Sequence, residues 1–303
     1  MSKRAYVLIP LMLAGLIIVG TTGCGSAATP IATPTATRTP APVITNTPKP
    51  PTASPTPQET ATPTATATPD KIVVTPFPAD VNPFTGLQVA DKAQLDRIPV
   101  AIKVSNSPQV RPQSGLGSAD LVFEHFAEGG ITRFTTVFYA NEPEMVGSVR
   151  SGRLIDLEIP AMYQAIFGYS GSSAGVKERI RDLDLFPDRI AAPDFGVGEP
   201  YFYRVPQEGK KFEHTLFSDP AVLRQLADER GINERPDFPM HMAFSDVAPA
   251  GGEPVDTFEV NYLVGTCTAE WEYLADSGVW GRSIAGTVHT DALTGRQITA
   301  SNV

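Results

Sequence analysis

A long tract of threonine, proline and alanine limits how much of this chain can fold. Thr-Pro steps recur through residues 25–78, from Thr29-Pro30 to Thr75-Pro76. Proline removes a backbone donor and favours extended backbone, and the tract has little apolar bulk to bury. We therefore expect residues 24–81 to form a disordered stalk, and a globular fold to be built from the residues that follow it.

The N-terminus has the pattern of an export signal. Lys3 and Arg4 precede an uncharged apolar run over 5–20, which at about 16 residues is shorter than the ~20 that a membrane-spanning helix needs. Cys24 follows, and lipoprotein signals place a cysteine at the cut site so that its lipid replaces the removed helix. We expect residues 1–23 to be a signal peptide and Cys24 to anchor the chain to the bilayer, on the extracytoplasmic face of the cell membrane. An ordinary secretory signal and an uncleaved anchor are the alternatives, and both also export the rest.

The chain has only one other cysteine, Cys267. If Cys24 carries lipid, the sequence predicts no internal disulfide, even in an oxidising compartment. Cys267 lies in a strand-like run, so we expect it to be buried as a small apolar side chain rather than to act as a nucleophile.

The charge of the chain excludes some partners. The formal net charge is −9, and no run of lysine or arginine occurs. Nucleic acid and anionic lipid head groups are therefore not expected as partners.

The residues after the stalk predict an α+β fold. We expect a mixed α/β head domain over 82–248 and a smaller β-rich domain over 249–303. In the head, the strand-like segments are 98–105, 121–128, 131–140 and 165–169, and the helix-like segments are 154–164, 174–183 and 221–230. In the second domain, the strand-like segments are 257–264, 269–274, 279–284 and the residues from 297. Because the last of these reaches residue 303, we expect this domain to be truncated.

The Gly129-Gly130 pair predicts a β-hairpin with a two-residue turn. In that register Glu124 and Glu128 share a sheet face with Arg133. Two carboxylates beside a guanidinium suit a catalytic acid/base pair, a site for a polar ligand or a structural cluster of salt bridges. The sequence leaves these three alternatives open.

Arginines in glycine- and serine-containing loops suggest an anion site. Arg150, Ser151 and Arg153 precede a predicted helix, and Arg111 and Ser114 lie in another loop. Such arginines bind carboxylate or phosphate groups, or else tie loops down by bonding carbonyls and acids such as Asp120.

Two further patterns are weaker. Gly171 to Gly175 matches G-x-S-x-G between a predicted strand and helix, so Ser173 is a candidate nucleophile, and Asp194 and His214 follow in the order of a triad. Only about 90 residues of head precede it, which is little room for a hydrolase sheet. The histidines show no ligand spacing, so no metal or cofactor is predicted; they are His125, His214, His241 and His289.

From residue 82 onward the sequence resembles the YerB-like lipoprotein family, which is defined by a domain of unknown function. The resemblance is carried by Arg111-Pro-Gln-Ser-Gly-Leu, Ala119-Asp120, Ala127-Glu-Gly-Gly-Ile-Thr-Arg-Phe134, Gly147-Ser-Val-Arg-Ser-Gly-Arg153 and 281–303. It implies a lipid-anchored, extracytoplasmic protein and brings no catalytic mechanism.

These observations favour a stalked lipoprotein that binds an envelope component, either a cell-wall polymer or a partner protein. The alternative is a cell-envelope hydrolase or transferase that uses Glu124 and Glu128, with Ser173 as a further catalytic candidate. The candidate binding residues are Arg111, Ser114, Asp120, Glu124, Glu128, Arg133, Arg150, Ser151, Arg153 and His214.

Overall fold

The computed structural model describes residues 77–238, 242–245, 251–262 and 267–303. All of them belong to one compact unit, Thr68–Val303. The predicted signal peptide, Cys24, nearly all of the predicted stalk, His241 and the predicted domain boundary after residue 248 lie outside the described residues.

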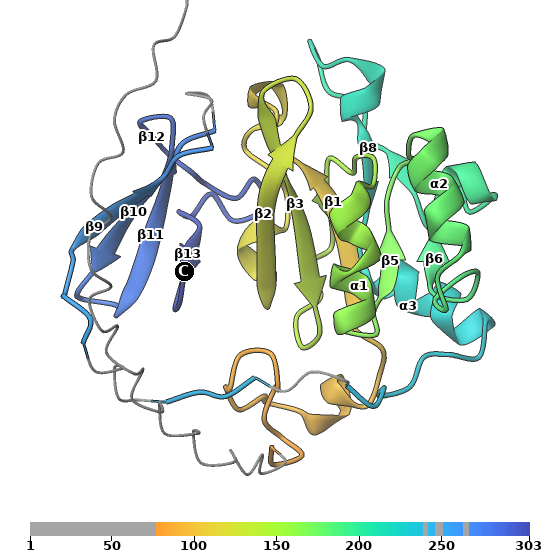
Figure 1. Ribbon diagram of the computed structural model, residues 1–303, viewed down its shortest axis with the longest axis horizontal. Coiled ribbons are helices and arrows are strands. Elements are labelled where there is room, and N and C mark those ends of the chain that lie inside the picture. Colours follow the sequence, from red (N-terminus) through yellow and green to blue (C-terminus); the bar gives the residue numbers. More distant parts are fainter. Residues whose placement is uncertain (1–76, 239–241, 246–250, 263–266) are drawn as a thin grey trace, which may run out of the picture. The chain divides into compact units, whose positions relative to one another are not determined.

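A mixed five-stranded sheet forms the centre of the head, with the order β2-β3-β1-β5-β6 (Figure 1). The middle strand β1 (Val100–Ser105) pairs antiparallel with β3 (Ile131–Phe138) and parallel with β5 (Ile166–Gly168). On the outer sides, β2 (Leu121–Ala127) pairs antiparallel with β3, and β6 (Ile190–Ala191) pairs parallel with β5. Every residue of β1 is buried, as its nearly continuous apolar sequence predicts for a strand covered on both faces.

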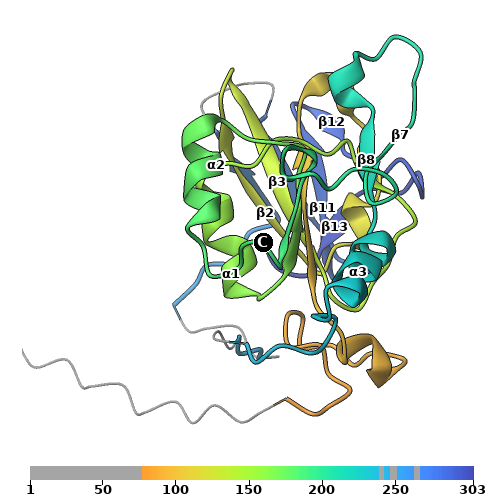
Figure 2. The same ribbon diagram turned by 90° about the vertical axis from the view of Figure 1, so that its right-hand side faces the viewer.

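Helices cover both faces of this sheet, α1 (Ile159–Met162) and α2 (Ala174–Arg181) on one side and α3 (Pro220–Glu229) on the other (Figure 2). Alternate residues of β1 supply the two cores. Ala101 packs in the cluster that contains α1 and α2 residues, and Ile102 packs in the cluster that contains α3 residues. We call these the α1/α2 face and the α3 face.

Short elements complete the head. A small antiparallel sheet has the order β4-β8-β7, with β4 at Val146–Gly147, β7 at Tyr203–Arg204 and β8 at Leu216–Ser218. The single-turn 3₁₀ helices are Lys92–Leu95, Pro108–Val110, Leu116–Ser118, Leu154–Leu157, Pro193–Phe195 and Phe212–His214. The predicted helix over 154–164 is therefore two short pieces, one 3₁₀ helix followed by α1.

The C-terminal residues form an antiparallel sheet, as predicted. Its order is β12-β11-β10-β9, and β13 also pairs with β11. The strands are β9 (Thr257–Val260), β10 (Ala269–Leu274), β11 (Val279–Ile284), β12 (Thr287–Val288) and β13 (Thr299–Ala300). A mixed sheet with helices followed by an antiparallel sheet is an α+β fold, which confirms the predicted class.

The register of the β2–β3 hairpin differs from the prediction. Ala127 pairs with Ile131, so the turn has three residues and not two. Gly129 and Gly130 both have positive φ, 73° and 71°, a backbone conformation that glycine adopts readily. A shift of one residue moves side chains to the opposite face. Arg133 therefore lies opposite His125, and the prediction that Arg133 shares a face with Glu124 is wrong.

Among the described residues, no helix combines the length and the hydrophobicity that a bilayer crossing requires.

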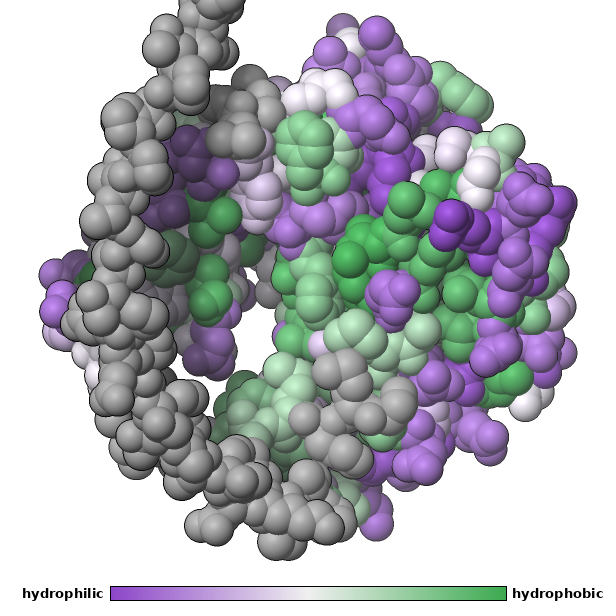
Figure 3. Space-filling model, viewed as in Figure 1, coloured by the Kyte–Doolittle hydropathy of each residue, from purple (hydrophilic) through white to green (hydrophobic). Residues whose placement is uncertain are grey.

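Hydrophobic surface gathers over α1 in the space-filling view, with hydrophilic residues around it (Figure 3). Leu154 and Ile155, just before α1, are 57% and 42% exposed.

A buried ion pair joins the two sheets. Oε2 of Glu124 on β2 lies 2.7 Å from Nη2 of Arg282 on β11, and their side chains are 11% and 3% exposed. The other carboxylate oxygen of Glu124 accepts hydrogen bonds from Thr132 Oγ1 at 2.6 Å and Asn106 Nδ2 at 3.0 Å. The guanidinium of Arg282 also lies 5.4 Å from the centre of the Phe134 ring. Glu124 is therefore fully engaged on the α3 face.

Substituting Glu124→Gln leaves the buried Arg282 cation without its counter-ion. Loss of one partner of a buried pair costs about 3 kcal/mol, so we expect the free energy of unfolding of the full chain to fall by about that much in urea titrations. Glu128→Gln is the matched control, because the Glu128 side chain is 69% exposed and its loss should cost about 1 kcal/mol or less. Equal effects of the two substitutions would contradict this assignment.

His289 extends the contact between the sheets and makes it sensitive to acid. Its Nε2 donates to Gln113 Oε1 at 2.6 Å, and its Nδ1 accepts a hydrogen bond from Arg282. Burial, followed by the charges of Arg282 and Arg111, lowers the pKa of His289 to about 3. The imidazole is therefore neutral in the folded protein at neutral pH.

We expect acidification to destabilise the fold through His289. Below about pH 6.5 the unfolded chain gains a proton at this residue that the folded chain does not, so stability falls as pH falls through this window. The contribution is at most about 1.4 kcal/mol per pH unit. Urea titrations at pH 7, 6 and 5 should show a shallower loss in His289→Gln than in the parent chain, and equal slopes would refute the prediction.

Candidate functional site

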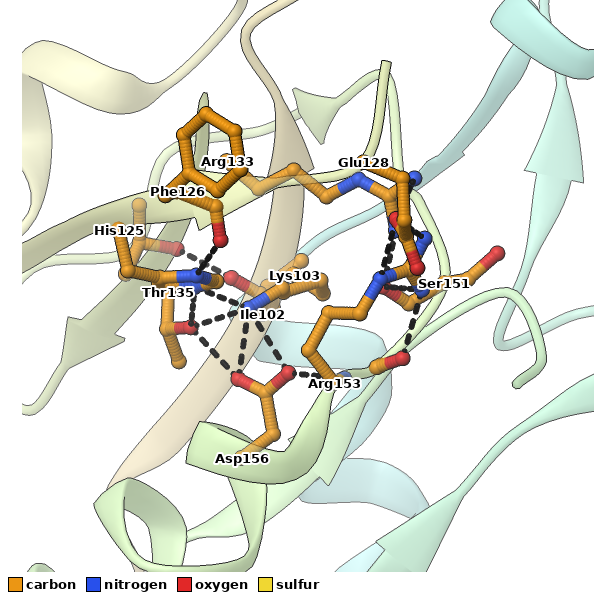
Figure 4. A network of polar contacts seen from close by, with 12 residues as sticks. Ile102, Lys103, His125, Phe126, Glu128, Arg133, Thr135, Ser151, Arg153 and Asp156 are labelled. Atoms are coloured by element: carbon orange, nitrogen blue, oxygen red, sulfur yellow. Dashed lines mark hydrogen bonds and ion pairs between the residues drawn. The ribbon is translucent and has the colours of Figure 1, made fainter. Parts of the chain in front are cut away.

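A lysine buried on the middle strand anchors a polar network on the α1/α2 face (Figure 4). Lys103 Nζ lies 2.8 Å from Asp156 Oδ2, and both side chains are 0% exposed. Lys103 also donates to Thr135 Oγ1 at 2.9 Å, and Thr135 Oγ1 donates to Asp156 Oδ1 at 2.7 Å. The third partner of the ammonium is Nε2 of His125. All three donors of this buried cation are thus used.

Burial dominates the protonation of this network. It lowers the pKa of Lys103 to about 8, although the Asp156 carboxylate acts in the opposite direction. Burial and the neighbouring ammonium also lower the pKa of His125, so its imidazole is neutral and its Nε2 accepts a hydrogen bond from Lys103. The result is an ion pair with a neutral histidine beside it.

Three arginines, which we call the arginine cluster, gather next to this network: Arg133 on β3, and Arg150 and Arg153 in the segment after β4. The carbonyl oxygen of Ser151 accepts from Arg133 Nη1 at 2.7 Å and from Arg153 Nη1 at 3.2 Å, so these two guanidinium groups are neighbours. Figure 4 shows both turned toward Glu128. The local fold brings them together because the backbone N–H of Arg153 donates to Asp156 Oδ2 at 2.6 Å.

The arginine cluster holds more positive than negative charge. Arg153 Nε bonds Glu128 Oε2 at 2.7 Å, whereas Arg133 Nη2 lies 3.8 Å from the same oxygen. Burial, then the charges of Arg153 and Arg150, lower the pKa of Arg133 to about 10. Burial acts to raise the pKa of Glu128, but the hydrogen bond from Arg153 acts in the opposite direction, and the net effect is a lowered pKa. One exposed carboxylate thus faces two guanidinium groups, those of Arg133 and Arg153.

Arg133 also carries an unsatisfied donor. The residue is 5% exposed, and its Nε has no hydrogen-bond partner among the described residues. A buried donor without a partner costs about 1–3 kcal/mol, so such groups call for an explanation. This donor adds to the positive character of the arginine cluster.

The structure separates several predicted site residues from the arginine cluster. Arg111 donates to the side chain and carbonyl of Asn106, at 3.1 and 2.8 Å, and lies 3.6 Å from the sulfur of Cys267. Cys267 is 0% exposed, which confirms its predicted burial. These residues lie with Glu124 at the contact between the two sheets.

Asp120 lies at the opposite end of the hairpin from Glu128. Its carboxylate accepts from the backbone N–H groups of Tyr139 and Ala140, at 2.6 and 3.1 Å, and from Asn82 Nδ2 at 2.9 Å. Burial raises the pKa of this carboxyl, against the effect of the backbone donors. In this position Asp120 ties the start of the head to the end of β3.

The predicted triad is not assembled among the described residues. Ser173 is exposed at the start of α2. Asp194 lies 3.6 Å from Lys177 Nζ, and His214 Nε2 bonds Gln109 Oε1 at 3.0 Å. Ser114 pairs its backbone with Gly147, and both residues line a cavity together with His214.

Sequence reasoning missed Lys103 and Asp156. One signal was present: Lys103 stands at an inward position of the otherwise apolar run 98–105, where a charge needs a buried partner. The identity of that partner was not readable, because Asp156 lies 53 positions away in the chain. Metal binding has no structural support in the part of the chain that is described, where no three His, Cys, Asp or Glu side chains group as ligands.

Comparison with known proteins identifies the class. Residues 84–233 match the family described as "Protein of unknown function (DUF3048) N-terminal domain". This part of the chain is a DUF3048 N-terminal domain, which includes the Lys103 network and the arginine cluster.

One relative is a Bacillus subtilis protein described as "Putative lipoprotein YerB". The two are 31% identical over 217 residues, which are 69% of this chain and 61% of that protein. The chain thus spans less than two thirds of that relative. The crystal structure of YerB from Bacillus subtilis superposes with a TM-score of 0.59 at 27% identity, over 72% of this chain and 71% of that one. The chain is a homologue of YerB, which confirms the resemblance seen in the sequence.

Replacing Lys103→Met leaves the Asp156 carboxylate buried without a cation. We expect the free energy of unfolding to fall by about 3–5 kcal/mol, and Asp156→Asn to cost a similar amount for the converse reason. The double variant should lose clearly less than the sum of the two, because it buries no unpaired charge. Urea titration of the four proteins gives the coupling energy, and additive losses would exclude a direct ion pair.

Proposed function

We propose that this chain is a lipid-anchored extracytoplasmic protein that binds an anionic component of the cell envelope through the arginine cluster. The predicted export signal with Cys24, and the description of the Bacillus subtilis homologue as a putative lipoprotein, support the location. The Thr/Pro tract, as a predicted stalk, supports a head that reaches away from the membrane. The envelope component is a polymer bearing carboxylate or phosphate groups.

The observation that carries the proposal is the unbalanced charge of the arginine cluster. Arg133 is buried with a donor unpaired, and its nearest carboxylate is that of Glu128, which is 69% exposed. Guanidinium groups bind carboxylate and phosphate through paired hydrogen bonds, and desolvated ones do so more strongly. Glu128 stands in the hairpin turn, where an incoming anion can replace it.

The arrangement gives less support to catalysis by paired carboxylates. Glu124 bonds Arg282, Thr132 and Asn106 on the α3 face. Glu128 bonds Arg153 beside the α1/α2 face. A pair of catalytic carboxylates must converge on one bond of a substrate, and these two are engaged on different faces of the sheet.

Co-sedimentation with purified insoluble cell-wall polymer tests the proposal. The parent chain should bind, and binding should weaken as salt rises because the contacts are ionic. Arg153→Ala should raise the dissociation constant about tenfold, corresponding to one charge-assisted contact. Arg179→Ala on α2 is the matched control, since Arg179 is an exposed arginine of the same domain and should leave binding unchanged.

Glu128→Gln separates binding from catalysis. Removal of the carboxylate that occupies the arginine cluster should strengthen binding severalfold. Mass spectra of the supernatant should show no released fragments with either protein. Fragments that appear with the parent chain and vanish with Glu128→Gln would overturn the proposal in favour of an enzyme. A dissociation constant that does not change with Arg153→Ala would contradict binding through the arginine cluster.

A further inference from the structure

A cavity lies next to β4, and its wall includes Ser148, two residues along the chain from Arg150 of the arginine cluster. It has a volume of about 240 Å³ and is lined by the loop before β2, by β4 and by the segment from Gln207 to Phe217. Its wall combines apolar side chains, among them Val110 and Phe217, with hydrogen-bonding groups of Ser148, Lys210 and His214. Ligand pockets commonly have this mixture of an apolar wall and a few placed polar groups.

Two residues of this wall each have a buried polar atom without a partner. Ser148 is 2% exposed and His214 is 6% exposed. Ser148 Oγ and His214 Nδ1 have no hydrogen-bond partner among the described residues. Each unsatisfied group carries a desolvation cost of about 1–3 kcal/mol. Two such costs in one cavity point to a ligand that supplies the missing hydrogen bonds.

The chemistry of His214 specifies what that ligand must bring. Its Nε2 donates to Gln109 Oε1 at 3.0 Å, which leaves Nδ1 as an acceptor. Burial, then the charge of Arg150, lowers the pKa of His214, so the ring is neutral at neutral pH. A ligand must therefore offer an O–H or N–H donor to Nδ1, while Ser148 Oγ can donate or accept. A bare phosphate or carboxylate cannot supply that donor.

Arg150 connects this cavity to the arginine cluster. It follows Ser148 by two residues, and its Nη1 donates to the carbonyl of Glu213, the neighbour of His214, at 2.9 Å. After burial and the charge of Arg153, the charge of Arg150 also lowers the pKa of Arg133 in the arginine cluster. A ligand that fills the cavity is thus next to the guanidinium groups.

We propose that the cavity holds one hydroxyl-bearing sugar unit and that the ligand of the adjoining arginine cluster is an acidic glycan. The sugar hydroxyls satisfy Ser148 and His214, its carbon face packs on the apolar wall, and its acidic group bonds Arg150 and Arg153. This inference rests on the proposed function, because the arginine cluster supplies the anion site, and it narrows the envelope component to a class of substrate.

Calorimetric titration of the full chain at pH 7 with two anions tests the inference. Trigalacturonate carries both hydroxyls and carboxylates, and tripolyphosphate carries charge without a sugar. Ser148→Ala removes an unsatisfied hydroxyl and should not destabilise the fold. It should weaken trigalacturonate binding about tenfold and leave tripolyphosphate binding unchanged. His214→Phe, which removes the acceptor, should have the same selectivity. Ser277→Ala, at an exposed serine in the turn between β10 and β11, is the matched control without effect.

The outcomes distinguish this inference from the function on which it rests. Arg153→Ala should weaken the binding of both anions. If both anions bind and depend on Arg153, but Ser148→Ala and His214→Phe change neither affinity, the sugar site is refuted and the proposed function stands. If neither anion binds, the proposed function fails and the inference fails with it.

Discussion

The ammonium group of Lys103 enters the interior from the middle strand of the mixed sheet, where both it and Asp156 are 0% exposed. A charge in that position is tolerated only when its hydrogen-bonding capacity is fully used and a counter-ion is at hand. Asp156, in the short 3₁₀ helix that precedes α1, provides the counter-ion. The same carboxylate accepts the backbone N–H of Arg153. One buried ion pair thereby fixes the backbone that carries the arginine cluster.

A second set of polar contacts holds the hairpin on the α3 face. Glu124 reaches Arg282, and Gln113 joins Ser105 and Asn106 to His289. These contacts make the C-terminal sheet part of the environment of β2 and β3. The hairpin is consequently held by charges on both faces, one set within the head and one set shared with the antiparallel sheet. Substitutions on the two faces should therefore differ in what they disturb, ligand binding on one and the contact between sheets on the other.

Sequence reasoning found the elements whose signals are local. The apolar run that became β1, the hairpin, and α3 with its Asp219 cap and Pro220 were all readable from patterns of a few residues. The hairpin register was not, because two adjacent glycines permit turns of two or three residues, and the difference moves Arg133 to the other face. The arginine cluster was anticipated in part: Arg133, Arg150 and Arg153 were candidates, but their grouping depends on Asp156 and Ser151. Contacts between residues far apart in the chain, such as Glu124 with Arg282, leave no local pattern.

The position of Asp120 has a mechanical consequence. Through Asn82 it links the first residues of the head to the end of β3, at the opposite end of the hairpin from Glu128 and Arg133. The hydrogen bonds of Asp120 therefore join the N-terminal segment to the sheet far from the turn that carries Glu128. If the head is tethered as proposed, a pull on its N-terminal segment would act at the end of the hairpin that lies opposite Glu128 and Arg133.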